Sequence, residues 1–204
     1  NMKKALVLFQ IGEEPLEDGM NILGAHIDTC SLDVKQNPLY EDGGLAYLDT
    51  HYYGGIKKYQ WPTIPLALIG VIYTRDGKKV EINVGMKEGD PIFYVSDLLI
   101  HMAQDQMKKT LAEGITGEQL QAIAWTNAEG KAKPKELFMK WLKDTYGIEE
   151  EDFATAELEL VPATKSRDVG FDRSLIASYG QDDRVCSYAN LEAILDAKPG
   201  VKTQ

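Results

Sequence analysis

Two widely separated acidic motifs carry residue types that could bind a metal. His26-Ile27-Asp28 ends an apolar run, and Gly180-Gln181-Asp182-Asp183-Arg184 precedes a helix-like run. An imidazole is a good zinc ligand, and a carboxylate close to it can orient the ring. A carboxylate with two oxygens can also bridge two divalent ions about 3.5 to 4 Å apart. Together the motifs predict a metallohydrolase site of which this chain holds only part.

Each motif also has a purely structural interpretation. His26 could be a buried histidine that is hydrogen-bonded to its neighbour, and Asp182 could cap the helix that follows and complement its dipole. Cys30 and Cys186 each lie four residues after a candidate ligand. Their spacing is not that of a zinc finger, so we expect both cysteines to pack as small apolar side chains. The residues alone leave these alternatives open.

The two ends of the chain have the pattern of an α/β sheet. Residues 3–11 and 20–27 are nearly continuous apolar runs separated by a turn-rich stretch, as in parallel strands buried on both faces. Residues 184–197 place apolar side chains on one helical stripe, which predicts a crossover helix. Such a helix should lead into another strand, which would begin near Val201. We therefore expect a sheet that is cut short at Gln204.

The middle of the chain has a different pattern. Residues 63–73 and 79–84 flank Asp76-Gly77 and predict a hairpin, and residues 153–160 alternate as in a half-exposed strand. One helix is expected after Ser96, with His101 on its polar side, and a second is expected to end at Gly147. The acidic run 149–152 reads as a solvated loop. A mixed unit therefore interrupts the α/β pattern.

Composition excludes several classes of protein. The chain has 204 residues and a formal net charge of −10, which argues against a nucleic-acid partner because phosphate binding needs a basic surface. No apolar run approaches the ~20 residues of a membrane span, so we expect no membrane partner and a cytoplasmic location. Two cysteines cannot form a disulfide framework, which fits a reducing compartment.

Four motifs, in order from about Leu23 to Leu195, carry a family resemblance. They are GAHIDTCSLDVKQNPLYE, THYYGGIKKYQW followed by IPLALIGV, DPIFYVSDLLIH, and VGFDRSLIASYGQDDR. They resemble the M18 zinc aminopeptidases, in the bacterial form of the aspartyl aminopeptidase group. The resemblance implies part of a dinuclear zinc exopeptidase catalytic sheet with an inserted mixed β/α dimerisation domain. The implied domains are residues 1–46, the first part of the catalytic domain, 47–162, the insert, and 163–204, the continued and truncated catalytic domain.

The resemblance also implies roles for individual residues. His26 corresponds to the first zinc-ligating histidine, Asp28 to the aspartate that orients it, and Asp182 to the aspartate that bridges two metals, with Asp183 in the adjoining position. His101 corresponds to an insert-domain histidine that reaches the neighbouring subunit's active site. The family usually has Ser-Pro after His-x-Asp, whereas this chain has Thr29-Cys30. The paired glutamates and the remaining ligands are expected beyond Gln204.

These roles imply a zinc-dependent aminopeptidase that removes N-terminal, acidic residues from peptides. Two zinc ions, or other divalent metals, would act on a bridging water, and dimers would assemble into a tetrahedral dodecamer. This chain alone would be inactive. Two alternatives remain: a non-catalytic assembly or peptide-binding module, and an M42-type metallopeptidase, which shares Asp-Asp-Arg but should lack THYYGGIKK.

Overall fold

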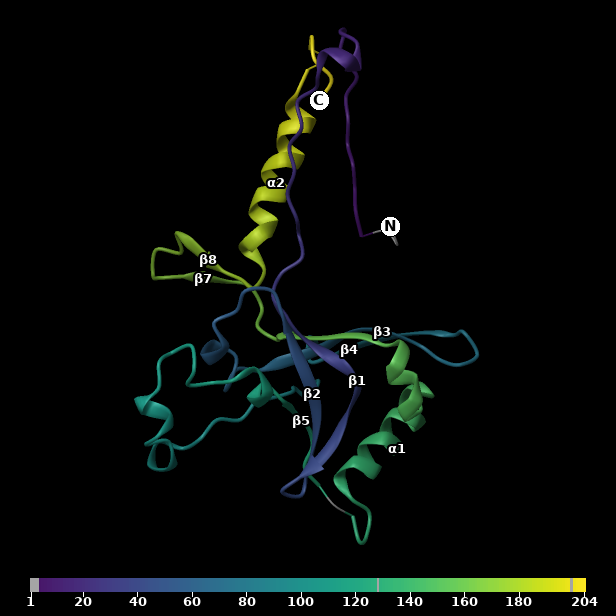
Figure 1. Ribbon diagram of the computed structural model, residues 1–204, viewed down its shortest axis with the longest axis vertical. Helices are drawn as coiled ribbons and strands as arrows, with labels where there is room; N and C mark the ends of the chain where they lie inside the picture. The colour runs from purple at the N-terminus through teal and green to yellow at the C-terminus, as the bar shows by residue number, and fades with distance from the viewer. Residues whose placement is uncertain (1–3, 128, 199) are drawn as a thin grey trace. The chain divides into compact units, whose positions relative to one another are not determined.

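The computed structural model describes residues 4–127, 129–198 and 200–204, and its contacts divide the chain into two compact units (Figure 1). Unit 1 combines the residues up to Thr29 with Gly180–Gln204, and unit 2 is Cys30–Tyr179. Among the described residues, every buried hydrophobic side chain lies in unit 2. Unit 2 therefore contains the hydrophobic core.

Unit 2 is built on one antiparallel sheet of six strands. The strand order is β4-β3-β6-β1-β2-β5, with every pairing antiparallel. The strands are β1 (Ser31–Asp42), β2 (Leu45–Tyr53), β3 (Leu66–Tyr73), β4 (Lys79–Val84), β5 (Ala122–Trp125) and β6 (Glu157–Pro162). Because β6 pairs with both β1 and β3, a strand from much later in the chain joins the two hairpins β1–β2 and β3–β4.

Glycines close the two hairpins. The turn between β1 and β2 uses Gly43 and Gly44, with φ of 57° and 78°. The turn between β3 and β4 uses Gly77 with φ of 80°, a conformation that a residue without Cβ adopts at no steric cost. The predicted hairpin around Asp76-Gly77 is confirmed.

Helix α1 (Pro134–Tyr146) contacts β1, β2 and β5. Its Phe138 and Leu142 are buried in the core, and Gly147 ends it in the left-handed conformation with φ of 73°. The helix predicted to end at Gly147 is confirmed. An apolar face repeating every three to four residues is sufficient here because the sheet supplies a surface against which that face packs.

The segment before β6 only partly follows the prediction. β6 buries Leu158 and Leu160 and exposes Glu157 and Glu159, as the alternation predicted, but residues 150–155 form the 3-10 helix η6 (Glu150–Thr155). Asp152 is buried, and its carboxylate accepts hydrogen bonds from the backbone N–H groups of Glu149 at 2.9 Å and of Arg75 at 3.2 Å. The acidic run is therefore partly structural, and its interpretation as a solvated loop is wrong for Asp152.

The helix predicted after Ser96 is absent. This region forms only two 3-10 turns, η3 (Ile100–Met102) and η4 (Gln106–Lys108). Helical stability comes mainly from burying an apolar face, and here the face has nothing to bury it. In this apolar turn segment, residues 98–111, the exposed large hydrophobic side chains are Leu98, Leu99, Ile100, Met102, Met107 and Leu111.

The remaining elements of unit 2 are small. Three-residue 3-10 helices occur at η2 (Lys58–Gln60) and η5 (Gly117–Gln119). The strands β7 (Arg167–Val169) and β8 (Leu175–Ala177) pair with each other in a separate two-stranded sheet and are exposed throughout.

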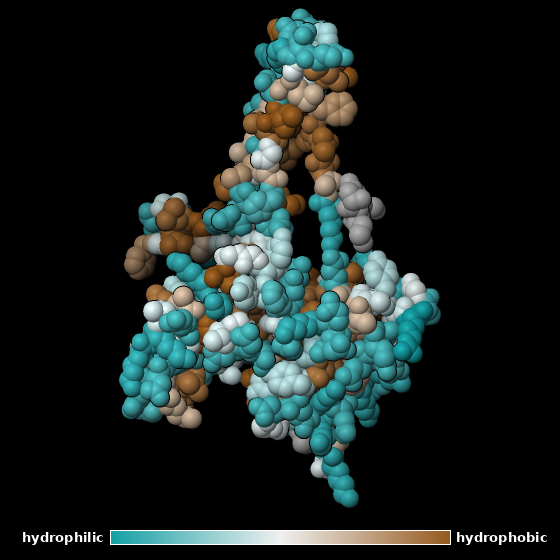
Figure 2. Space-filling model, in the orientation of Figure 1, coloured by the Kyte–Doolittle hydropathy of each residue, from teal (hydrophilic) through white to brown (hydrophobic). Residues whose placement is uncertain are grey.

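Unit 1 contains helix α2 (Gln181–Asp196) and the 3-10 helix η1 (Leu16–Asp18). The predicted helix at 184–197 is confirmed, but its apolar stripe is exposed, with Val185 and Tyr188 each 63% accessible. Figure 2 shows hydrophobic side chains gathered along α2 and the N-terminal segment of the same unit. No described helix is long and apolar enough to cross a membrane.

The strands predicted at 3–11 and 20–27 are wrong for the described residues of those runs. Met20 forms one isolated parallel bridge with Thr203, and Gln10 exchanges two backbone hydrogen bonds with Gln204 at 2.8 and 2.9 Å. A strand needs neighbours along its length, and such short pairings do not supply them. The strand expected from Val201 is reduced to this bridge for the same reason.

The chain is thus a mixed α/β protein with a large antiparallel sheet. The two contact units differ in extent from the predicted domains. The first predicted catalytic part, 1–46, includes β1, yet β1 pairs with β2 and β6 in the sheet of unit 2. The assignment of residues 47–162 as an inserted domain stays a prediction.

Candidate metal centre

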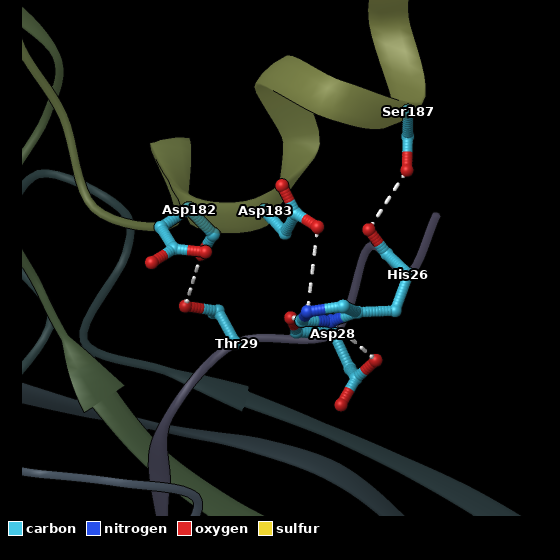
Figure 3. A network of polar contacts seen from close by, with 6 residues as sticks. All are labelled: His26, Asp28, Thr29, Asp182, Asp183 and Ser187. Carbon is cyan, nitrogen blue, oxygen red and sulfur yellow. Dashed lines mark hydrogen bonds and ion pairs between the residues drawn. The ribbon is translucent and has the colours of Figure 1, made fainter. Parts of the chain in front are cut away.

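Two segments of unit 1 bring the sequence-predicted metal ligands together (Figure 3). His26 and Asp28 lie in an irregular segment, whereas Asp182 and Asp183 lie in the first turn of α2. Gly180 precedes that turn with φ of 77°, and Asp182 and Asp183 have non-helical backbone angles and are joined by a cis peptide bond. The regular helix therefore begins only after the two aspartates.

His26 is held through one ring nitrogen and presents the other. Its Nδ1 lies 3.1 Å from Oδ1 of Asp28 and 3.1 Å from the backbone oxygen of Asp28. Both partners accept hydrogen bonds, so the neutral ring carries its proton on Nδ1. The lone pair of Nε2 then points away from Asp28, toward Oδ2 of Asp183 at 3.4 Å. A histidine oriented by a carboxylate in this way is prepared to bind a metal through Nε2.

The surrounding charges act on the pKa of His26. Desolvation works to lower the pKa, but the hydrogen bond with Asp28 and the negative charges of Asp28 and Asp183 outweigh it. The pKa of His26 is therefore raised above its ordinary value of 6.5. Because a metal binds the neutral imidazole, a cation at this site would take the place of the proton that the charged ring carries on Nε2, facing Asp183.

The spacing of the donor atoms fits zinc. Zinc binds histidine nitrogen and carboxylate oxygen at about 2.1 Å, so two tetrahedral ligands of one ion lie roughly 3.4 Å apart. The distance between Nε2 of His26 and Oδ2 of Asp183 is also 3.4 Å. One ligand atom from each of His26, Asp182 and Asp183 lies within 4.8 Å of the other two. Within the described residues this is the one group of three or more such side chains.

His101 is not part of this group. It lies in η3, in unit 2, and is exposed between the exposed side chains of Ile100 and Met102. The sequence argument placed it on the polar side of an α-helix, and that placement is wrong because the helix does not form. Its predicted role in a neighbouring subunit does not depend on the helix and stays a prediction.

The two cysteines behave differently. Cys30 is partly buried and packs against the core of unit 2, with its Sγ 3.8 Å from the backbone oxygen of Gly55, so the packing prediction is confirmed. Cys186 is exposed, so the same prediction is wrong for it. A hydrogen bond to Asp183, desolvation and the nearby negative charges raise the pKa of the Cys186 thiol. Neither cysteine belongs to the metal-binding group.

Sequence reasoning underestimated three residues of this centre. It gave Asp183 only an adjoining position, although Asp183 is the carboxylate that faces Nε2 of His26. It gave no role to the hydroxyls of Thr29 and Ser187, which donate to the backbone oxygens of Asp182 and His26. The Asp-Asp pair in the sequence was a signal for Asp183. No sequence motif marks a serine or threonine whose hydroxyl bonds to a backbone oxygen in a distant segment.

Comparison with known proteins identifies the family. The model of the family described as "Aminopeptidase I zinc metalloprotease (M18)" matches residues 1–204. The chain is 54% identical to the probable M18 family aminopeptidase 1 of Clostridium acetobutylicum, covering 100% of this chain and 44% of that protein. It is 47% identical to the protein of the same name from Thermotoga maritima, covering 98% and 44%.

Solved structures of M18 aminopeptidases also match the fold of this chain. The crystal structure of aminopeptidase I from Clostridium acetobutylicum matches with a TM-score of 0.86 and 52% identity, over 96% of this chain and 44% of that one. The M18 aminopeptidase from Thermotoga maritima matches with a TM-score of 0.85 and 44% identity, over 96% and 46%. The chain thus spans less than half the length of these relatives. Because the whole chain matches the M18 family model, the alternative of an M42-type peptidase is rejected. It belongs to the M18 family of zinc metalloproteases.

Proposed function

We propose that the intact protein is a zinc-dependent aminopeptidase that removes N-terminal residues from peptides, and that this chain supplies part of its active site. The observation that carries the proposal is the centre of His26, Asp182 and Asp183. Its donor atoms lie within 4.8 Å of one another, and Nε2 of His26 faces Asp183 while Asp28 holds Nδ1. The M18 membership of the chain supports reading this centre as a zinc site.

His26, Asp182 and Asp183 would hold the metal. Zinc supplies a Lewis acid that polarises the scissile carbonyl and acidifies water. Asp28 keeps the proton of His26 on Nδ1, so that the lone pair of Nε2 stays available to bind the metal. The general base and the remaining ligands belong, by the family resemblance, to residues outside this chain.

The preference for N-terminal Asp or Glu rests on the resemblance to the aspartyl aminopeptidase group alone. It is tested by comparing kcat/KM of the intact protein on otherwise identical peptides that begin with Asp, Glu, Leu or Lys. Equal values would remove the acidic preference while leaving the aminopeptidase activity in place.

The proposed assembly is a homo-oligomer, with dimers built through residues 47–162 and associating into a tetrahedral dodecamer. The apolar turn segment, residues 98–111, supports an interface because its large side chains are 50 to 70% exposed. A solved structure of S. cerevisiae mApe1, 18% identical to this chain, is a dodecamer. Light scattering of the intact protein tests the assembly, and an active monomer would refute it. The proposed location is the cytoplasm.

His101 would act in the neighbouring subunit as a donor to the substrate. Its exposure in the apolar turn segment supports a role at an interface. His101→Ala should then lower turnover by ~10² to 10³, as loss of one oxyanion donor does, with little loss of metal. Oligomers mixed from His101→Ala and Asp182→Ala subunits should regain part of the activity. Mixed oligomers without any complementation would show that His101 does not act across subunits.

The central test measures metal content and peptidase activity together. His26→Ala and Asp182→Ala should each lower both, because each removes a ligand, whereas Cys30→Ser should spare both since Cys30 packs in unit 2. Full activity in a metal-free His26→Ala variant would refute the proposal. A protein that binds peptides without cleaving them, at full zinc content, would instead support the alternative of a non-catalytic binding module.

A further inference from the structure

We propose that Thr29 and Ser187 are positioning residues of the metal centre, because their hydroxyls tie together the two segments that carry the ligands. The inference rests on the proposed zinc site. The Oγ1 of Thr29 donates a hydrogen bond to the backbone oxygen of Asp182 at 3.0 Å. The Oγ of Ser187 donates to the backbone oxygen of His26 at 2.8 Å. Figure 3 shows both bonds, one on each side of the pair formed by His26 and Asp183.

These two bonds act where secondary structure does not. Residues 22–27 form no strand, and among the described residues their backbone makes no hydrogen bond with another backbone group. Asp182 and Asp183 belong to α2, but their backbone angles are non-helical. The segment that carries His26 is therefore not held by regular backbone pairing, and side-chain hydrogen bonds help to set its spacing from Asp182 and Asp183.

The direction of the Ser187 bond is informative. A serine inside a helix commonly bonds to the carbonyl four residues earlier in its own helix, which here is that of Asp183. Ser187 donates instead to His26, in the other segment. The hydroxyl of Thr29 likewise donates to Asp182, in the other segment. Each hydroxyl therefore contacts the backbone of a ligand-bearing residue in the opposite segment.

This arrangement has a consequence for metal affinity. A ligand pair that is already spaced for zinc binds the ion without first being ordered. Nε2 of His26 and Oδ2 of Asp183 have that spacing, at 3.4 Å. Loss of either hydroxyl should let the segments separate and weaken zinc binding. Changes in the partners of metal ligands typically cost 10- to 100-fold in affinity, and we expect about tenfold for each hydroxyl because it acts on the backbone rather than on the ligand atom.

The experiment uses the intact protein and measures zinc affinity by competition with a chelator of known strength. Thr29→Val and Ser187→Ala remove the hydroxyls, and Thr29→Ser and Ser187→Thr keep them. The matched control is Thr155→Val, since Thr155 donates a hydroxyl hydrogen bond to the backbone oxygen of Tyr73 at 2.5 Å within unit 2, which contains none of the residues of the metal-binding group. Thermal unfolding of every variant identifies a loss of folding, and the visible spectrum of bound Co²⁺ reports the coordination geometry.

The expected result is that Thr29→Val and Ser187→Ala each bind zinc about tenfold more weakly, with an altered Co²⁺ spectrum, while the conservative variants and Thr155→Val bind as the wild type does. Affinities unchanged in Thr29→Val and Ser187→Ala, together with loss of zinc in His26→Ala, would overturn the positioning role alone. Zinc bound normally by His26→Ala would overturn the ligand assignment, and the positioning role with it. If Thr29→Val does not fold, Ser187→Ala decides.

Discussion

Gly70 in β3 is the position where the sheet of unit 2 should be most sensitive to one added methyl group. Its φ of 145° lies in a region that side chains rarely adopt, and it is paired with Leu158 of β6. A Cβ built at Gly70 would lie 2.0 Å from the backbone oxygen of Glu157 and 3.0 Å from Cα of Leu158. Those atoms belong to the backbone of the neighbouring strand and cannot rotate away.

The magnitude for Gly70→Ala has two parts. A residue held in a backbone region reserved for glycine costs about 1 to 3 kcal/mol. Removing the contact with Glu157 requires β3 and β6 to separate locally, which would break about two ladder hydrogen bonds at about 1 kcal/mol each. The total of about 3 to 5 kcal/mol is a large fraction of the 5 to 15 kcal/mol that typically stabilises a domain. Gly70→Ala should therefore unfold unit 2 at a much lower urea concentration.

Tryptophan fluorescence during urea unfolding is a suitable assay, because Trp61, Trp125 and Trp141 all lie in unit 2. The matched control is Gly89→Ala. Gly89 also has a positive φ, of 89°, but a Cβ there meets nothing within 4 Å, so it shows the backbone cost alone, about 1 kcal/mol. If Gly70→Ala loses no more free energy of unfolding than Gly89→Ala does, the close approach of β6 to Gly70 is refuted.

Three further predictions concern the core, a turn and the metal centre. Phe138→Ala should lower the free energy of unfolding in urea by about 3 to 5 kcal/mol, because the ring is only 3% exposed. Lys140→Ala, at an exposed position of the same helix, should lower it by almost nothing. Equal losses would show that α1 does not pack on the sheet. Asp90 accepts hydrogen bonds from the backbone N–H groups of Lys87 and Gly85, and these bonds lower the pKa of its carboxyl below 3.8. The carboxylate therefore stabilises the folded state fully above its unfolded-state pKa, and this stabilisation is lost as the pH falls through its folded-state pKa. Asp90→Asn should therefore be less stable than the wild type in urea at pH 7, and the difference in free energy of unfolding should shrink as the pH falls below 3.8. A difference that stays constant with pH would contradict this. Asp183→Asn should weaken zinc binding while exposed Asp168→Asn should not, as measured by chelator competition, and equal affinities would exclude Asp183 as a ligand.

Features encoded by neighbouring residues could be predicted from the sequence. The Asp76-Gly77 turn, the end of α1 at Gly147 and the alternation of Leu158 and Leu160 in β6 follow from φ preferences and side-chain periodicity, which act within a few residues. The four long motifs likewise predicted the M18 family. His26, Asp28 and Asp182 were selected from the sequence, and the structure brings them together, although their catalytic roles stay predictions.

Tertiary contacts decided the rest, because periodicity identifies an apolar face without saying whether anything packs against it. The stripe of α1 meets the sheet and is buried, whereas the similar pattern after Ser96 finds no surface and forms only short turns. The apolar runs near the N-terminus lack neighbouring strands for the same reason. In the metal centre, the spacing of His26 and Asp183 and the hydroxyl bonds of Thr29 and Ser187 join segments more than 150 residues apart. Only the fold sets such distances, since no local preference relates residues so far apart in the chain.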